Sequence, residues 1–299
     1  MFENWVLLSL MSAFLFSIKD ILSKKIFSKN VHPKQILFEE YFLMLFVILF
    51  LFFPKINFLI FIEYWYLFLF KALTLFVAVL TYLNLLKKYD ISLVSPLMNL
   101  SPVFLIFLSF FILNEKLSLI QILGIFIVII STYFLEIHIH HHNKTNPSAH
   151  ILKNVKKLNY NFFLPAILML IMISFTAIFD KLIFENNLNI YTNMYYTSLI
   201  IFLSLLIYYY KTNHLKLAFK NIIYEPTTLL ISVFALISTF FILTAIAIPT
   251  ALVSLIVPLK RVSSLFSSIF GGMLFHETHL VQKFISISFM LFGLFLIVF

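Results

Sequence analysis

The chain has 299 residues, of which 62% are hydrophobic and 11% are charged, and its mean hydropathy is +1.05. Soluble domains contain about 45–50% apolar and about 25% charged residues, so the composition excludes a soluble globular fold and indicates a polytopic membrane protein. The formal net charge of +9 does not indicate nucleic-acid binding, because the lysines lie in the short gaps between apolar runs, as topogenic loop charges do. The absence of cysteine excludes disulfides, thiol chemistry and cysteine metal sites.

The first half of the chain contains five apolar runs, each near the roughly 20 residues that a membrane-spanning helix requires. They cover residues 5–22, 36–53, 64–86, 92–113 and 119–136. Ser118 and Gln121 have the spacing of a capping box, which predicts that the fifth helix begins directly after Ser118.

The second half repeats this pattern after a polar connector at residues 138–161. Its five apolar runs cover residues 162–184, 191–210, 227–247, 252–275 and 280–299. The sequence therefore predicts an all-α integral membrane protein with ten transmembrane helices. Because the lysines concentrate in the odd-numbered connectors, these are expected to face the cytoplasm and both termini the opposite side.

The two halves are also related in sequence, since residues 92–115 align without gaps on residues 254–277. A repeat with an odd number of spans must enter the membrane in opposite senses, which predicts two inverted-topology repeats, an architecture common in transporters. The expected division is a first five-helix repeat at 1–137, a connector at 138–161 and a second repeat at 162–299. The identical pairs include Ser92 and Ser254, Pro96 and Pro258, Leu97 and Leu259, Ser101 and Ser263, Phe104 and Phe266, and Glu115 and Glu277.

Lys260 and Arg261 lie in the middle of the ninth apolar run, and Arg261 is the only arginine of the chain. About ten residues of helix separate them from either end of the run, roughly 15 Å, which is too far for the side chains to reach water. A cation at the centre of a spanning helix costs about 2.5–3.5 kcal/mol on insertion scales. Two adjacent cations therefore require a compensating partner, a wet cavity or a ligand.

Two segments carry a resemblance to a known family: KKYDISLVSPLMNLSPVFLIFLSFFILNEKLSLIQILGIFIVIISTY and TALVSLIVPLKRVSSLFSSIFGGMLFHE. With ten spans in two repeats and a glutamate closing each fourth helix, the chain resembles the drug/metabolite transporter superfamily, in particular its EamA-like branch. The resemblance implies a transporter of small organic solutes with a cavity between the halves, in a membrane that is expected to be the bacterial inner or plasma membrane. No catalytic constellation appears in the sequence, so neither enzymatic activity nor a cofactor is expected. Lys260-Arg261 is also similar to the lysine–arginine pair by which plastid-type sugar-phosphate translocators of this superfamily bind substrate phosphate.

Two interpretations of Lys260 and Arg261 follow. In the first they hold an anion, since arginine offers a planar fork for a carboxylate or phosphate and lysine adds a point charge. In the second they form a structural ion pair with an acid on another helix. Their counterparts in the first repeat are Met98 and Asn99, which predicts an asymmetric site, and Ser263 is a further candidate beside the pair.

Prolines at positions 96, 102 and 258 are expected to kink or locally open their helices. Open helix backbone would suit a binding site, although an ordinary kink explains the prolines as well.

Other polar residues within the spans are candidates of lower specificity. Lys71 is either a second cation for the substrate or a snorkelling side chain beside Glu63. Glu39 and Glu40 are either counter-charges to the Lys260–Arg261 pair that also bind a coupling proton, or an interfacial pair facing headgroups. Candidates for hydrogen bonds and ring contacts to a solute are Tyr82, Asn84, Tyr195 and Tyr196, whereas Lys19, Asp20, Asp180 and Lys181 are expected to set helix depth or to pair locally.

The sequence therefore predicts a secondary transporter that moves a small organic solute, anionic or zwitterionic (an organophosphate, amino acid or organic acid), by alternating access. The expected partners are this solute, the lipid bilayer and a coupling proton, with no nucleic acid. One alternative keeps the fold but makes it an exporter of hydrophobic or cationic compounds in which Lys260-Arg261 is structural. Another is a lipid-handling or scaffolding membrane protein without solute flux.

Overall fold

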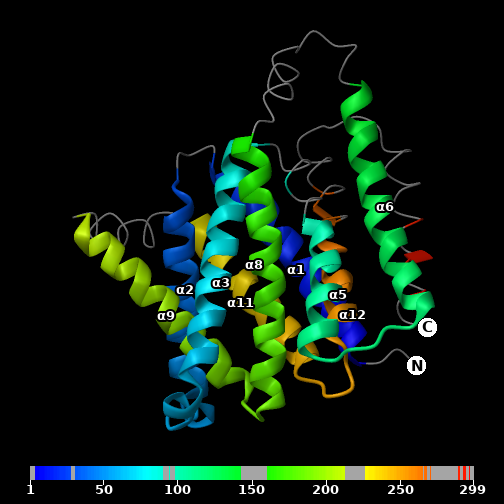
Figure 1. Ribbon diagram of the computed structural model, residues 1–299. Coiled ribbons are helices and arrows are strands. Elements are labelled where there is room, and N and C mark those ends of the chain that lie inside the picture. The colour runs from blue at the N-terminus through cyan, green and yellow to red at the C-terminus, as the bar shows by residue number, and fades with distance from the viewer. Residues whose placement is uncertain are drawn as a thin grey trace.

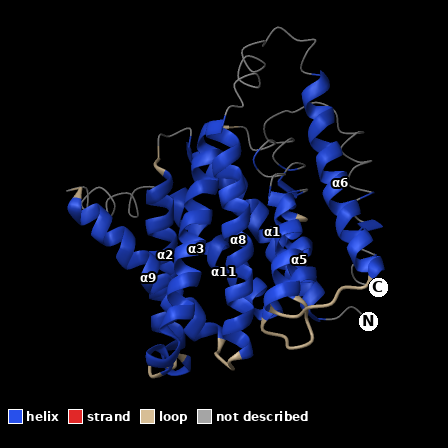
Figure 2. Ribbon diagram, in the orientation of Figure 1, coloured by secondary structure: helices blue, strands red, loops and turns tan. Residues whose placement is uncertain are grey.

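The computed structural model describes residues 4–27, 31–89, 94, 98–142, 160–212, 226–264, 266–267, 270, 289, 292–293 and 296. In this part of the chain all regular structure is helical, and the connections are turns and loops (Figure 2). The longer helices run side by side as a bundle, with α6 at one edge (Figure 1). The helices are α1 (Asn4–Phe27), α2 (Pro33–Phe52), α3 (Ile60–Lys88), α5 (Ser101–Ile112), α6 (Leu119–His142), α8 (Tyr160–Glu185), α9 (Ile190–Lys211), α11 (Pro226–Ile246) and α12 (Val253–Lys260), with 3₁₀ turns η1 (Phe53–Lys55) and η2 (Met98–Leu100).

Six of the described helices, α1, α2, α3, α8, α9 and α11, are long and apolar enough to cross a membrane. They coincide with six of the ten apolar runs, so the chain is a multi-pass integral membrane protein. The run at 119–136 lies within α6, whereas the run at 280–299 falls almost entirely outside the described residues. The total of ten spans therefore stays a prediction.

The beginning of α6 follows the predicted capping box. The backbone amide of Ser118 donates to Gln121 Oε1 at 3.0 Å, and the amide of Gln121 donates to Ser118 Oγ at 3.2 Å. This reciprocal pair satisfies amides that the first helical turn leaves without partners, and the prediction is confirmed. The other end of α6 differs from expectation, because the helix continues to His142 instead of giving way to the connector at residue 138.

Prolines mark the helices near the centre of the bundle. Pro102 lies in the first turn of α5, directly after the 3₁₀ turn η2, so it marks the start of a helix, where a missing amide is tolerated. Pro258 lies inside α12, and two residues later this helix gives way to a turn at Arg261 and Val262. Pro96 lies outside the described residues.

Small hydroxyl residues allow the helices of the two halves to approach closely. Where α1 packs on α11, Ser12 Oγ donates to the Ser238 carbonyl at 2.8 Å and Ser238 Oγ donates to the Ser12 carbonyl at 2.9 Å. Where α8 packs on α3, Thr176 Oγ1 donates to Thr74 Oγ1 at 3.2 Å. Serine and threonine thus take the place that glycine often has in membrane helix contacts, since the chain has only 4 glycines.

A carboxylate from the first half of the chain holds the beginning of α12. Glu115 is 7% exposed, and it accepts hydrogen bonds from the backbone amides of Val253, at 2.8 Å, and Ser254, at 3.1 Å, as well as from the Ser254 hydroxyl. A negative group is favoured at a helix N-terminus, where amides are unpaired and the helix dipole is positive. Glu115 therefore fixes the short helix that leads to Lys260 and Arg261.

Glu115→Gln is expected to lower the thermal stability of the protein in detergent. An amide offers one acceptor oxygen where the carboxylate offers two, so at least one buried donor of α12 loses its partner, at about 1–3 kcal/mol. The measurement is the shift in melting temperature. Glu185→Gln, which removes an exposed acid at the end of α8, is the matched control, and an equal shift in both variants would contradict the capping role.

Candidate functional site

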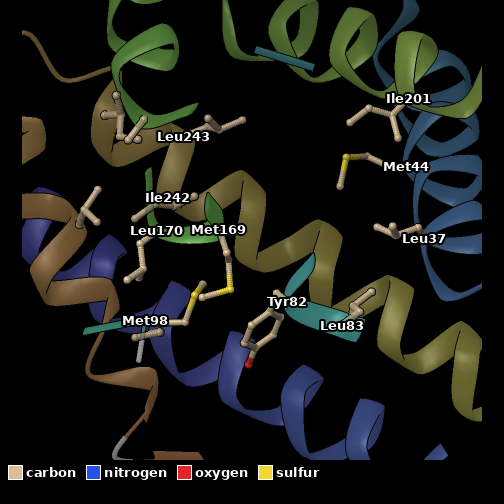
Figure 3. Close-up of a cluster of buried hydrophobic side chains, with 14 of the residues drawn as sticks. Leu37, Met44, Tyr82, Leu83, Met98, Met169, Leu170, Ile201, Ile242 and Leu243 are labelled. Atoms are coloured by element: carbon tan, nitrogen blue, oxygen red, sulfur yellow. The ribbon is translucent and has the colours of Figure 1, made fainter. Parts of the chain in front are cut away.

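A cavity of about 130 Å³ lies between the helices of the two halves. Helices α1, α2, α3, α8, α9, α11 and α12 contribute to its wall, together with Met98 of η2. Most of the wall is apolar. Five of the wall residues, Met44, Tyr82, Met98, Ile242 and Leu243, are labelled in Figure 3.

Lys260 and Arg261 both line this cavity, at the point where α12 ends. Arg261 is 4% exposed, and its Nε donates to the Ser101 hydroxyl at 3.0 Å. Lys260 Nζ lies 5.0 Å from the centre of the Phe16 ring, within the range of a cation–π contact. Within the part of the chain that the structure describes, neither residue forms an ion pair with an acid.

A second charged group on the wall joins α3, α8 and α9. Lys71 forms an ion pair with Asp180 and donates to Asn193 Oδ1 at 2.7 Å. Asn193 Nδ2 in turn donates to Asp180 Oδ1 at 3.0 Å. Lys71 is buried and does not reach the interface beside Glu63, so the snorkelling interpretation is wrong.

A third group joins α1 and α2. Lys19 and Glu40 form an ion pair at 2.9 Å, and both line the cavity. Glu40 is therefore the partner of Lys19, and the prediction that it balances Lys260 and Arg261 is not what the contacts show. Glu39 and Glu40 are each 4% exposed, which contradicts an interfacial pair facing headgroups.

The charges that the described residues place on the wall do not balance. Four basic side chains, Lys19, Lys71, Lys260 and Arg261, and two acidic ones, Glu40 and Asp180, line the cavity. Each acid pairs with a lysine, which leaves Lys260 and Arg261 as the two wall cations without an acidic partner among the described residues. Two adjacent cations without an ion-pair partner in an enclosed space are unfavourable, and an anion that enters the cavity relieves this cost.

The structure brings some of the candidate residues to the cavity and separates others from it. Tyr82 and Met98 lie on the wall. Asn84 is exposed on α3 and is not among the residues of the cavity wall, so its contact with a solute stays a prediction. Tyr196 does not line the cavity: its hydroxyl donates to the Phe58 carbonyl at 3.1 Å, and its ring stacks on Phe61.

Two more candidate residues, one in the ninth apolar run and one in the matching run of the first half, are not placed on the cavity wall. Ser263 is buried without lying on the wall. The side chain of Asn99 falls outside the described part of the structure.

Sequence reasoning missed Lys19, Asp20 and Asp180. Lys19 and Asp180 line the cavity, and Asp20 lies behind Tyr82, whose hydroxyl donates to Asp20 Oδ2 at 2.7 Å. Their position was the available signal, because each lies at least a full turn inside its helix. Ionisable residues inside a spanning segment are rare and face the bundle interior or a cavity. Lys181 has the structural role expected of it, since it donates to the carbonyl of Ala251 at 2.9 Å.

Comparisons with known proteins give a family match over the first part of the chain and a fold. The model of the EamA-like transporter family matches residues 3–137, which confirms the resemblance drawn from the sequence. None of the curated proteins matches the chain. Among solved structures 22 chains match. One, described as "Crystal structure of protein", has 13% sequence identity and a TM-score of 0.67 over 99% of this chain and 96% of that chain, a likeness that shows the fold alone.

Proposed function

We propose that this EamA-like membrane transporter carries a small organic solute with a carboxylate or phosphate group, which Lys260 and Arg261 bind inside the central cavity. The observation that supports this proposal is that these two cations line the cavity, while each acid among the described wall residues is paired with another lysine. Arginine presents a planar fork of donors that matches a carboxylate or phosphate, and lysine supplies a point charge. The solute neutralises the pair and so favours closure of the cavity around it.

The cavity also limits the size and character of the solute. One water molecule needs about 10–15 Å³ of cavity space. A cavity of about 130 Å³ therefore holds a solute of roughly ten non-hydrogen atoms. The apolar part of the wall, with Phe16, Met44 and Leu75, suits a carbon skeleton better than a bare inorganic ion. Phosphate monoesters, amino acids and organic acids of this size fit both conditions.

Transport by alternating access is supported by the way the helices of the two halves pack. Helix α1 packs on α11 and α8 packs on α3, so the first helix of each half contacts the third helix of the other. Helices α2 and α9, the second of each half, pack on each other. This reciprocal pattern is what two related five-helix repeats around a central site would give, and the proposed motion is a rocking of one repeat against the other.

Uptake into liposomes that contain the purified protein tests the proposal. Labelled phosphate monoesters, amino acids and dicarboxylates are compared with lipophilic organic cations. We expect accumulation of at least one anion or zwitterion, which also raises the melting temperature of the protein because it binds only the folded state. Uptake of the cations alone would instead favour an exporter of hydrophobic or cationic compounds, whose binding the apolar wall also suits.

A further inference from the structure

Asp20 differs from the other acids near the cavity in its contacts. Glu40 and Asp180 each pair with a lysine, whereas Asp20 accepts a hydrogen bond from the Tyr82 hydroxyl and forms no ion pair within the described residues. Asp20 is 1% exposed, and its Oδ1 has no hydrogen-bond partner in that part of the chain. A buried carboxylate with one bare oxygen is costly unless positive charge lies nearby or a proton neutralises it.

The positive charge near Asp20 comes from three residues. Lys19, beside it on α1, is held by Glu40 of α2. Lys260 and Arg261 of the α12 end both interact electrostatically with Asp20. Helix α3 contributes Tyr82, and α11, which packs along α1, contains no titratable residue. The cations not held by another acid are therefore the same two that are proposed to bind the substrate.

We propose that Asp20 is a proton-binding site that couples proton uptake to anion binding, so that the transporter carries its anionic solute together with a proton. This inference rests on the proposed function of Lys260 and Arg261. In the empty cavity the ionised Asp20 balances part of their charge. A bound anion takes over that role and leaves Asp20 as a buried negative charge close to a negative ligand. Asp20 then takes up one proton and becomes a neutral carboxylic acid.

Charge is conserved in this scheme: one anionic charge and one proton enter the site, and no other group changes its protonation. Binding free energies are reciprocal, so a proton that favours the anion is itself favoured by the anion to the same extent. Moving both together also reduces the net charge carried through the membrane by one unit, which lowers the electrical cost of transport.

Tyr82 provides the connection between Asp20 and the cavity. It lines the cavity and donates its hydroxyl proton to Asp20, and Figure 3 shows the hydroxyl pointing from α3 toward α1. The hydroxyl can pass its proton to Asp20 Oδ2 while it accepts another from water in the cavity. Tyr82 is thus a positioning residue for the proton.

Sulfate binding to the purified protein, measured by calorimetry across pH, tests the inference. Sulfate keeps both negative charges across the neutral range, so any pH dependence of its affinity comes from the protein. For the wild type we expect the affinity to fall as pH rises, by up to about tenfold for each pH unit, the slope of one coupled proton. Asp20→Asn, which resembles the protonated carboxyl in shape and charge, is expected to bind sulfate with little pH dependence.

Two further variants control the result. Glu185→Gln, an exposed acid outside the cavity, should keep the wild-type pH dependence. Tyr82→Phe removes the hydrogen bond to the Asp20 carboxylate and should move the fall in affinity to higher pH, which a purely structural role of Tyr82 would not do. This variant decides the question if Asp20→Asn does not fold.

Three outcomes would overturn the inference. An unchanged pH slope in Asp20→Asn would assign the titration to another group, such as Lys260, and an unmoved pH profile in Tyr82→Phe would have the same consequence. Wild-type affinity for sulfate that does not change with pH would remove the coupling, whereas the proposed function is judged separately by the uptake of organic solutes.

Discussion

Arg261→Ala and Lys260→Ala are each expected to reduce uptake of anionic solutes by about 10- to 100-fold, the effect of losing one charge-assisted interaction of about 1.5–3 kcal/mol. Both side chains line the cavity, and neither is held by an acid among the described residues. Their positive charge is therefore available to a ligand. The double variant should have no measurable uptake.

The measurement is initial uptake into liposomes at matched protein content, with melting temperature as the test of folding. Lys34→Ala is the matched control, because Lys34 lies at the start of α2 with its Nζ 3.6 Å from the centre of the Tyr208 ring, and it does not line the cavity. Arg261→Lys keeps the charge but loses the planar fork, so intermediate uptake is expected. Unimpaired uptake by both alanine variants would refute the anion site.

The membrane spans could be predicted because a segment that crosses a bilayer must be apolar, and this composition can be read directly from a single sequence. Lipid offers the backbone no hydrogen-bond partners, so long apolar runs must be helical, and six of the ten runs coincide with helices long and apolar enough to span. The exact ends were less predictable. Helix α6 continues through the histidines to His142, because helix propagation depends on local backbone hydrogen bonds and does not stop where the side chains become polar.

The cavity position of Lys260 and Arg261 was also predictable, because two adjacent cations within an apolar run have few acceptable environments. The pairing of the other charges was not predictable. Lys71 has Glu63 eight residues away in sequence, yet its partner is Asp180, on another helix. A helix that is apolar on all sides does not reveal from its sequence which face turns inward. The sequence therefore could not distinguish Tyr82, which lines the cavity, from Asn84, which is exposed on the same helix.

Asp180→Asn is expected to destabilise the protein by about 3–5 kcal/mol, the usual cost of removing one member of a buried ion pair. The substitution keeps the shape of the side chain and leaves Lys71 as a buried cation with Asn193 as its remaining polar partner. Thermal unfolding in detergent measures the effect. Lys71→Met alone should cost less, because Asp180 keeps the hydrogen bond from Asn193.

The double variant Lys71→Met/Asp180→Asn distinguishes a structural pair from a substrate site. With both charges removed no buried charge is left unpaired, so the double variant should be more stable than Asp180→Asn alone, although it has lost one more native side chain. Uptake by the double variant should likewise exceed that of Asp180→Asn alone. In the wild type Lys71 is already engaged by Asp180 and Asn193, and binding of the anion depends on Lys260 and Arg261. A double variant that is stable but does not transport would mean that Lys71 leaves Asp180 during the cycle and binds the solute as a third cation.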